Sequence, residues 1–221
     1  MIKLIVTADD FGYSKLYNKM ILELIEEQAV TSTSVMIDEI DNGQKDQVER
    51  LIQLSKKNLV SVGLHIYFKN INFEVEIDRQ FEKFVAVFGF EPSHLDIHKK
   101  DYLKEGFPLI QEFCKKKNIP CKNLSLFDDK LMNIDGLITT KDSIFDGTRK
   151  TFSQISEWLG SLRGGSYCIN FHPGYYDPNS VSSLNKEREA DAENIRKMVR
   201  GLSEYNIELA NFNDLAKEYQ K

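Results

Sequence analysis

The sequence predicts an α/β protein, specifically a single-domain distorted (β/α) barrel of the TIM-barrel-like type. Short apolar runs rich in β-branched residues alternate with amphipathic helical patterns along the chain, which is typical of a parallel sheet. No linker, internal repeat or low-complexity tract interrupts the 221 residues, so we expect one domain over residues 1–221. The first strand leads into Asp9-Asp10-Phe11-Gly12, whereas an open doubly wound sheet usually has a glycine-rich turn there.

The first half of the chain predicts four strands, each followed by a helix. Apolar residues at Leu16, Met20, Leu24 and Ile25, with charged residues between them, mark the first amphipathic helix. Similar patterns place the strands at 4–8, 32–37, 59–66 and 93–98, and the helices at 16–29, 44–57, 73–88 and 107–117.

The second half is less regular. A short strand is expected within 119–127, and residues 128–146 show only the turn signals Asp135-Gly136 and Asp146-Gly147. Thr151 and Gln154 predict a capping box for a helix that continues through Leu162. A strand at 167–171, a polar loop, a charged helix from about 185 to 202 and a strand at 207–210 follow. Asn213-Asp214 is expected to cap the terminal helix.

The composition excludes several classes of function. With 41% hydrophobic and 29% charged residues and a formal charge of −5, the chain is typical of a soluble globular protein without a basic footprint. We therefore expect neither nucleic acid nor an anionic membrane as a partner. No segment resembles a transmembrane span or signal peptide, which favours a cytoplasmic protein. The three cysteines indicate reduced core thiols. The aromatic residues at 81–90 are compatible with a homodimer interface, although core packing is favoured.

Two adjacent carboxylates end the first strand. Burying one unpaired carboxylate costs several kcal/mol, and neighbouring carboxylates repel each other. Asp9 and Asp10 therefore need a cation or a shared proton if both are buried. Taken alone, the segment leaves two interpretations open: a metal or catalytic site, or one Asp that caps the next helix beside a solvent-exposed one.

Three of the four histidines lie at, or next to, the predicted carboxyl ends of strands. These are His65, His98 and His172, and in a parallel α/β fold such ends converge on one mouth. Two neutral imidazoles and one carboxylate form a set that holds a divalent cation and leaves positions open for water and substrate. The second Asp is then free to serve as a base, and a third His at the rim is placed to protonate a leaving group.

The segment His94-Leu95-Asp96-Ile97-His98 places three polar side chains on one face of a strand, because the strand period is two. Only His98 lies close enough to the carboxyl end to act as a ligand. Asp96 is expected one layer below, where it can orient a ligand imidazole. For His94 a structural role is the favoured interpretation.

Several of these motifs resemble, in this order along the chain, the YdjC-like (ChbG-type) carbohydrate deacetylases. The matching segments are Ala8-Asp9-Asp10-Phe11-Gly12, Val30-Thr31-Ser32-Thr33-Ser34, Gly63-Leu64-His65, His94-Leu95-Asp96-Ile97-His98, His172-Pro173-Gly174 and Arg188-Glu189-Ala190-Asp191. The resemblance spans almost the whole chain. It implies a distorted (β/α) barrel that removes acetyl groups from N-acetylated sugars such as chitooligosaccharides.

The resemblance also implies roles for individual residues. Asp10, His65 and His98 correspond to the metal ligands and Asp9 to the base, and the family is described as magnesium-dependent. Two imidazoles, however, suit zinc, cobalt or manganese better than magnesium, so the metal stays open. From the residues, His172 is the candidate acid.

Candidate substrate contacts lie on two loops. They are Tyr175 and Tyr176 after His172, and Lys100 after His98. The chain departs from the family after His65, in the residues that follow His98, and at Lys122-Asn123, where many members have an arginine.

Three functions are compatible with these residues. The first is a metal-dependent hydrolase acting on the acetamide of an N-acetylated sugar or oligosaccharide. The second is a metal-dependent lyase, isomerase or non-sugar amidase that uses the same site. The third is a divergent member that binds carbohydrate or another small ligand with little or no turnover. Release of acetate from N-acetylglucosamine oligomers distinguishes the first from the other two.

Overall fold

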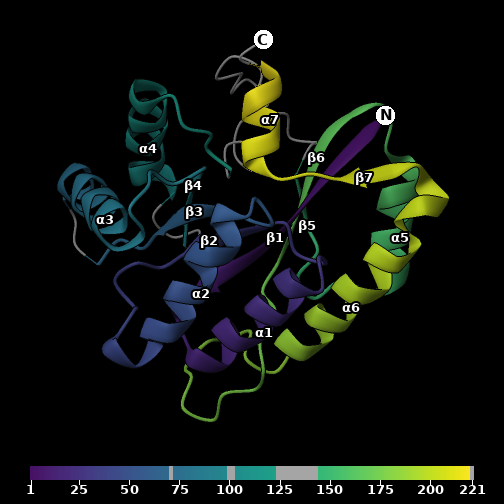
Figure 1. The fold of residues 1–221 in the computed structure, drawn as a ribbon, viewed down its shortest axis with the longest axis horizontal. Helices are drawn as coiled ribbons and strands as arrows, with labels where there is room; N and C mark the ends of the chain where they lie inside the picture. The colour runs from purple at the N-terminus through teal and green to yellow at the C-terminus, as the bar shows by residue number, and fades with distance from the viewer. Residues whose placement is uncertain (70–71, 99–102, 123–143, 220–221) are drawn as a thin grey trace.

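The computed structural model describes residues 1–69, 72–98, 103–122 and 144–219. In these residues seven parallel strands form one curled sheet with helices packed around it, so the fold is a distorted, open (β/α) barrel (Figure 1). The strand order is β4-β3-β2-β1-β6-β5, and β7 pairs beside β1. The predicted fold class is confirmed.

The longest strand, β1, lies at the centre of the sheet and organises its neighbours. The strands are β1 (Ile2–Phe11), β2 (Ser32–Val35), β3 (Ser61–Ile66), β4 (Leu95–Ile97), β5 (Ile144–Asp146), β6 (Gly165–Phe171) and β7 (Ile207–Leu209). β6 pairs with β1 from Ile2 to Ala8. On the other side of β1, β7 pairs with its first residues and β2 with its last.

The helices follow the strands in the order that the sequence predicts. They are α1 (Lys15–Glu26), α2 (Lys45–Lys56), α3 (Phe73–Phe88), α4 (Leu103–Lys117), α5 (Phe152–Ser161), α6 (Arg188–Gly201) and α7 (Phe212–Tyr219), with short 3₁₀ turns η1 (Asn42–Gln44) and η5 (Leu202–Tyr205). The predicted capping box at Thr151 and Gln154 is present at the start of α5.

The structure corrects three local predictions. Residues 144–146 form strand β5 against β6, although the sequence predicted an irregular segment there; three residues are too few for a hydrophobic period to show. The terminal helix is capped by Asn211, whose side chain accepts from the Asp214 N–H while Asp214 accepts from the Asn211 N–H. The strand predicted within 119–127 appears as a single bridge at Cys121; residues 123–127 lie outside the described residues.

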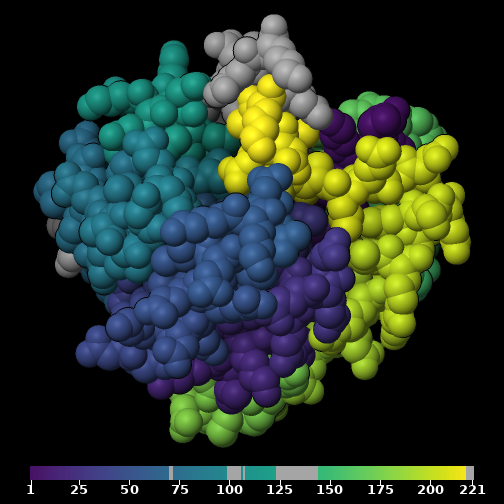
Figure 2. All heavy atoms as spheres, in the orientation of Figure 1, coloured from purple at the N-terminus to yellow at the C-terminus, as the bar shows by residue number. Residues whose placement is uncertain are grey.

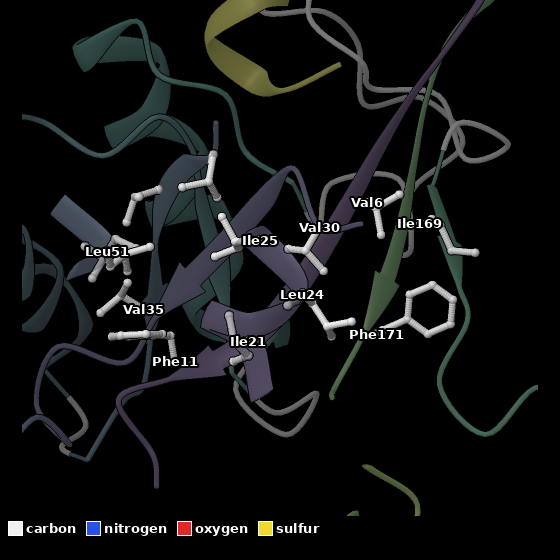
Figure 3. Close-up of a cluster of buried hydrophobic side chains, with 14 of the residues drawn as sticks. Val6, Phe11, Ile21, Leu24, Ile25, Val30, Val35, Leu51, Ile169 and Phe171 are labelled. Carbon is white, nitrogen blue, oxygen red and sulfur yellow. The ribbon is translucent and has the colours of Figure 1, made fainter. Parts of the chain in front are cut away.

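The main core lies between the sheet and the helices that cover it. Figure 3 shows Ile21 and Leu24 of α1 in one cluster with Val6 and Phe11 of β1 and Phe171 of β6. Helices α1, α2 and α6 lie side by side over this core, as the space-filling view shows (Figure 2). Salt bridges from Arg50 to Glu26 and from Arg196 to Glu27 join these helices at the surface.

The aromatic residues of α3 belong to the core. Phe81, Phe84 and Phe88 are buried, and the rings of Phe84 and Phe88 stack with their centroids 4.5 Å apart. This agrees with the favoured interpretation of the 81–90 segment as core packing. Among the described helices, none is both long and apolar enough to span a membrane.

A β-bulge interrupts β1 where its two carboxylates lie. The register with β2 shifts between Ala8 and Phe11, and Asp10 has a φ of 70°. Next to it Gly12 has a φ of 101°, and a Cβ there would lie 2.8 Å from the Met36 carbonyl oxygen. The chain therefore turns into α1 through a backbone conformation that only glycine adopts without strain at this point.

Replacing Gly12 should be costlier than replacing another glycine of similar φ. Gly12→Ala combines left-handed strain with a clash against Met36, so we expect a loss of about 2–4 kcal/mol in the free energy of unfolding. Gly89, at the end of α3, has a φ of 76°, and a Cβ added there would meet no atom within 4 Å, so Gly89→Ala should cost only about 1 kcal/mol. Urea unfolding of both variants checks this, and equal losses would contradict it.

Candidate metal centre and surrounding site

The bulge in β1 explains how two adjacent residues direct their side chains into one site. In a regular strand Asp9 and Asp10 would point to opposite faces. A bulge inserts an extra residue and re-aims the side chains around it, and Asp tolerates the left-handed conformation seen at Asp10. Both carboxylates are buried, with exposed fractions of 5% and 2%.

Three donors from three different strand ends meet beside this bulge. The Oδ1 atom of Asp10 lies 3.1 Å from His98 Nδ1 and 3.4 Å from His65 Nε2. The two ring nitrogens are 3.1 Å apart. Asp10 Oδ1 is buried, and neither contact has hydrogen-bond geometry, so this oxygen has no hydrogen-bond partner among the described residues.

These donors fit a divalent cation. Ligands at about 2.1 Å from one ion are separated by about 3.0 Å at neighbouring corners of an octahedron and about 3.4 Å in a tetrahedron. The three separations in the site fall within this range. A buried carboxylate oxygen without a partner and two imidazole nitrogens facing it are also the chemistry that such an ion requires. Asp10, His65 and His98 therefore form a group that can hold a metal, and we call these three residues the donor group.

Asp96 orients the His65 ring from below, as the strand period predicts. The two residues are in register between β3 and β4, and Asp96 Oδ1 lies 2.5 Å from His65 Nδ1. When the ring is neutral, a proton on Nδ1 is donated to this carboxylate, and the lone pair of Nε2 faces Asp10 and His98. Such a partner fixes both the tautomer and the orientation of a ligand imidazole.

A buried lysine pairs with the carboxylates of Asp9 and Asp96, which are not part of the donor group. Lys122 Nζ contacts both Asp9 Oδ1 and Asp96 Oδ2, and it lies 3.1 Å from Ser34 Oγ. The side chain is only 1% exposed. Asp9, His65 and Asp96 form a second cluster of close donors, but Lys122 already occupies the space between its two carboxylates.

The charges stabilise one another across the site. Burial opposes the ionised form of Asp10, yet His65, His98, His172 and Arg188 hold its pKa well below the ordinary value. Burial likewise opposes a charge on His65, but Asp96, Asp10 and Asp9 raise its pKa to about 10. The pKa of Lys122 is raised by Asp9 and Asp96 despite its burial, so this lysine carries its positive charge.

His172 follows β6 at the same edge of the sheet. Ala8 and Phe171 are partners in the β1–β6 register, which brings His172 next to the end of β1. Its Nδ1 atom lies 2.8 Å from the Thr148 hydroxyl. The backbone N–H of His172 donates to Asp191 at 3.2 Å. The ring is therefore fixed by a hydroxyl, and its backbone by a carboxylate of α6.

His94 has the structural role that the sequence favoured. Its ring is fully buried and stacks on Phe212 with centroids 4.1 Å apart, and its nitrogens contact Ser34 and Ser93 at 3.0 Å each. Burial, together with the charge of Lys122, lowers its pKa to about 3, so the ring is neutral.

The candidate substrate contacts lie in different places. Tyr175 donates its hydroxyl to Glu23 of α1 at 2.6 Å, and half-exposed Tyr176 is held through its backbone N–H by Glu189 of α6. Lys100 lies outside the described residues. The rings that do lie beside the donor group are those of Tyr67 and Tyr13, whose centroids are 5.1 Å and 6.2 Å from that of His98.

Sequence reasoning assigned no role to the two buried cations of the site. Arg188 Nη2 donates to Asp10 Oδ2 at 2.6 Å, and its side chain is 1% exposed. Arg188 lies in a run of charged residues that is typical of a solvated helix face. For Lys122 a signal exists, because it follows the apolar residues at 119–121 on a short predicted strand.

A family model and curated relatives both match nearly the whole chain. The family model for YdjC-like proteins matches residues 3–73 and 68–207. A carbohydrate deacetylase from Clostridium beijerinckii is 28% identical over 251 residues, covering 96% of this chain and 100% of the relative. A chitooligosaccharide deacetylase from Proteus mirabilis is 25% identical over 255 residues, covering 96% and 98%.

Solved structures share the fold at lower identity. A candidate cellobiose-phosphate cleavage protein from Enterococcus faecalis superimposes with a TM-score of 0.74 at 20% identity, covering 96% of this chain and 98% of that one. A family 4 acetyl xylan esterase from Clostridium thermocellum, in complex with a cobalt ion, has a TM-score of 0.55 at 11% identity, covering 96% and 89%.

Removing the Lys122 charge should destabilise the protein strongly. Lys122→Met leaves two buried carboxylates without their cation, and breaking a buried ion pair in this way costs about 3–5 kcal/mol. Lys45→Met removes an exposed pair with Glu49 and should cost less than about 1 kcal/mol. Urea unfolding with EDTA present checks both values. A Lys122→Met variant as stable as Lys45→Met would show that the buried charges are compensated in another way.

Proposed function

Because this chain belongs to the YdjC-like protein family, we propose that it is a metal-dependent hydrolase that removes acetyl groups from N-acetylated sugars or oligosaccharides. Chitooligosaccharides are the first substrates to test, since relatives spanning nearly the whole chain are named carbohydrate deacetylase and chitooligosaccharide deacetylase. The reaction consumes one water and yields acetate and a free amino sugar.

One observation carries this proposal. The unpartnered Oδ1 of Asp10 faces two imidazole nitrogens at 3.1 Å and 3.4 Å, directly beside a second buried carboxylate that is paired with a lysine. The two neighbouring carboxylates therefore have different partners. Asp10 Oδ1 faces the two imidazole nitrogens, and Asp9 is left as a proton acceptor.

Asp10, His65 and His98 are the residues that would hold the divalent cation. When bound, such an ion acidifies a water molecule and polarises the acetyl carbonyl group. Two imidazole donors favour Zn²⁺, Co²⁺ or Mn²⁺ over Mg²⁺. The cobalt ion named with the acetyl xylan esterase of the same fold agrees with this preference.

Asp9 is the proposed general base. Its Oδ1 atom is held by Lys122, which fixes the orientation of the carboxylate. This buried carboxylate is placed to accept the proton of the attacking water. Lys122 also contacts Asp96, so the base and the His65 ring are positioned by the same buried ammonium group.

His172 is the proposed general acid. The contact between Nδ1 and the Thr148 hydroxyl orients the ring, and leaves Nε2 as the atom that can reach a substrate. A proton held there is delivered to the amine nitrogen as the bond to the acetyl carbon breaks. The two proton-transfer groups thus come from the ends of β1 and β6, which pair directly.

Tyr67 and Tyr13 are proposed to contact the sugar. Tyr67 follows His65 by two residues, and the buried Gln80 side chain binds both its backbone N–H, at 3.2 Å, and its carbonyl, at 2.9 Å. This fixes the backbone of Tyr67 next to His98. Aromatic rings beside the donor group provide the apolar faces on which sugar rings stack.

Because Asp9 and Asp10 are assigned different roles, their substitution should impair different properties, namely turnover and metal binding. Asp9→Asn should lose most acetate release while the protein still binds metal, because it removes the proton acceptor and leaves Asp10, His65 and His98 in place. Asp10→Asn and His98→Ala should lose metal and activity together. Elemental analysis of protein purified without chelator, combined with an acetate assay on N-acetylglucosamine oligomers, tests this. Full activity in Asp9→Asn would exclude Asp9 as the base.

The acid should affect turnover without affecting the metal. His172→Gln is expected to lower kcat by about 10²–10⁴-fold, the usual contribution of a general acid, with metal content unchanged. Thr148→Val, which removes only the orienting hydroxyl, should have a smaller effect in the same direction. A kcat of His172→Gln within about twofold of the wild-type value would require another proton donor.

A further inference from the structure

Arg188 is a buried arginine that contacts two residues of the candidate site, Asp10 and His172. Its Nη2 atom donates to Asp10 Oδ2 at 2.6 Å and to Ser182 Oγ at 3.2 Å, and Nη1 donates to the His172 carbonyl at 3.3 Å. The guanidinium carbon lies 3.8 Å from the centre of the Tyr17 ring. Burying an arginine is costly unless its charge is paired, and here the paired group is Asp10.

The contact between Arg188 and Asp10 gives the two carboxylate oxygens of Asp10 different surroundings. Oδ2 is held by Arg188, whereas Oδ1 has no hydrogen-bond partner among the described residues and faces the two imidazole nitrogens. A carboxylate without such a partner can bind a cation through both oxygens. Bidentate binding occupies a second coordination position, which is one that a reacting water or substrate needs.

The first turn of α6 also holds the proposed acid. Arg188 binds the carbonyl oxygen of His172, and Asp191, three residues later, accepts from its backbone N–H at 3.2 Å. Both backbone groups of His172 are therefore fixed by side chains of the same helix turn. Because Arg188 binds Asp10 at the same time, one guanidinium group links the donor group to the acid.

The packing around Arg188 leaves it little freedom. Tyr17 is fully buried beneath the guanidinium plane, and its hydroxyl contacts Ser180 and Asn185 in the loop before α6. Gly174 makes room for this stack, since a Cβ there would lie 2.5 Å from the Tyr17 ring and 3.0 Å from Arg188. The arginine is thus held at a fixed position relative to β1 and β6.

We propose that Arg188 is a positioning residue that restricts Asp10 to a single ligand oxygen and sets the placement of His172 relative to the donor group. This rests on the proposed function, because it requires that Asp10 bind a metal. It assigns to Arg188 a role in the geometry of the site that differs from a contribution to folding alone.

The experiment uses Co²⁺ as the probe, because its visible absorption weakens as its coordination number rises. Arg188→Met should bind Co²⁺ with a weaker visible band than the wild type, since Oδ2 becomes free to bind, and with an affinity no lower than that of the wild type, since a positive charge has been removed. Acetate release should fall by about 10²-fold in kcat, with KM within about threefold, because the acid and the donor group lose their common support.

Arg188→Lys separates the two parts of the proposal. It keeps a charge against Asp10 but lacks the second nitrogen for the His172 carbonyl. We expect a wild-type cobalt spectrum together with a lower kcat, and a kcat equal to that of the wild type would overturn the link to His172. If Arg188→Met does not fold, the decision rests on this variant. A cobalt spectrum of Arg188→Lys that differs from the wild type would contradict the role assigned to the charge.

Arg196→Met is the matched control. Arg196 lies on the same helix and joins it to α1 through two contacts with Glu27, at 2.7 Å and 2.8 Å, away from the donor group. This variant should leave the spectrum, the affinity and kcat unchanged. Wild-type protein that binds no Co²⁺ would overturn the proposed function itself. Wild-type binding with an unaltered Arg188→Met spectrum would overturn only the role of Arg188.

Discussion

The structure depends on the burial of carboxylates at the end of β1 and beside it. Asp9, Asp10 and Asp96 are all within 5% of complete burial, and burying such charges without partners would cost more than the whole stability of a typical domain. Two buried cations, Lys122 and Arg188, offset two of the three negative charges, and a protonated His65, whose pKa is raised to about 10, offsets the third. Asp10 Oδ1, which has no hydrogen-bond partner among the described residues, lies beside this ring. A divalent cation that displaced the His65 proton would leave the site with one net positive charge, which suits a group that must bind a developing oxyanion.

The compensating charges come from distant parts of the chain. Lys122 lies 113 residues from Asp9, and Arg188 lies 178 residues from Asp10. Each contact joins β1 to a residue far away in the sequence. The site charges are therefore compensated only when the strands have assembled in the observed order. The bulge at Asp9 and Asp10 makes this arrangement feasible, because without it the two carboxylates would face opposite sides of the sheet. The left-handed backbone conformation of Asp10 is thus located where the chemistry is proposed to occur.

The sequence contains enough information to predict the fold class and to predict that the residues of the donor group lie close together, because both follow from simple periodicities. Alternating strands and helices imply a parallel sheet, and parallel strands bring Asp10, His65 and His98 to one edge. The strand period of two also places Asp96 beneath the His65 ring. The cations could not be assigned in this way. Arg188 sits among charged neighbours, and its burial depends on how the loop at 173–187 folds over Tyr17, which no local pattern encodes. The bulge is likewise invisible, because it arises from pairing with β2.

The central claim is that Asp10, His65 and His98 are the ligands of one divalent cation and that Asp9 is not. Anomalous diffraction from crystals grown with Zn²⁺, recorded at the zinc absorption edge, tests this most directly. The account predicts one anomalous peak at about 2.0–2.2 Å from Asp10 Oδ1, His65 Nε2 and His98 Nδ1, with Lys122 still in contact with Asp9. A peak bound instead by Asp9, His65 and Asp96, or no peak near these residues, would contradict it.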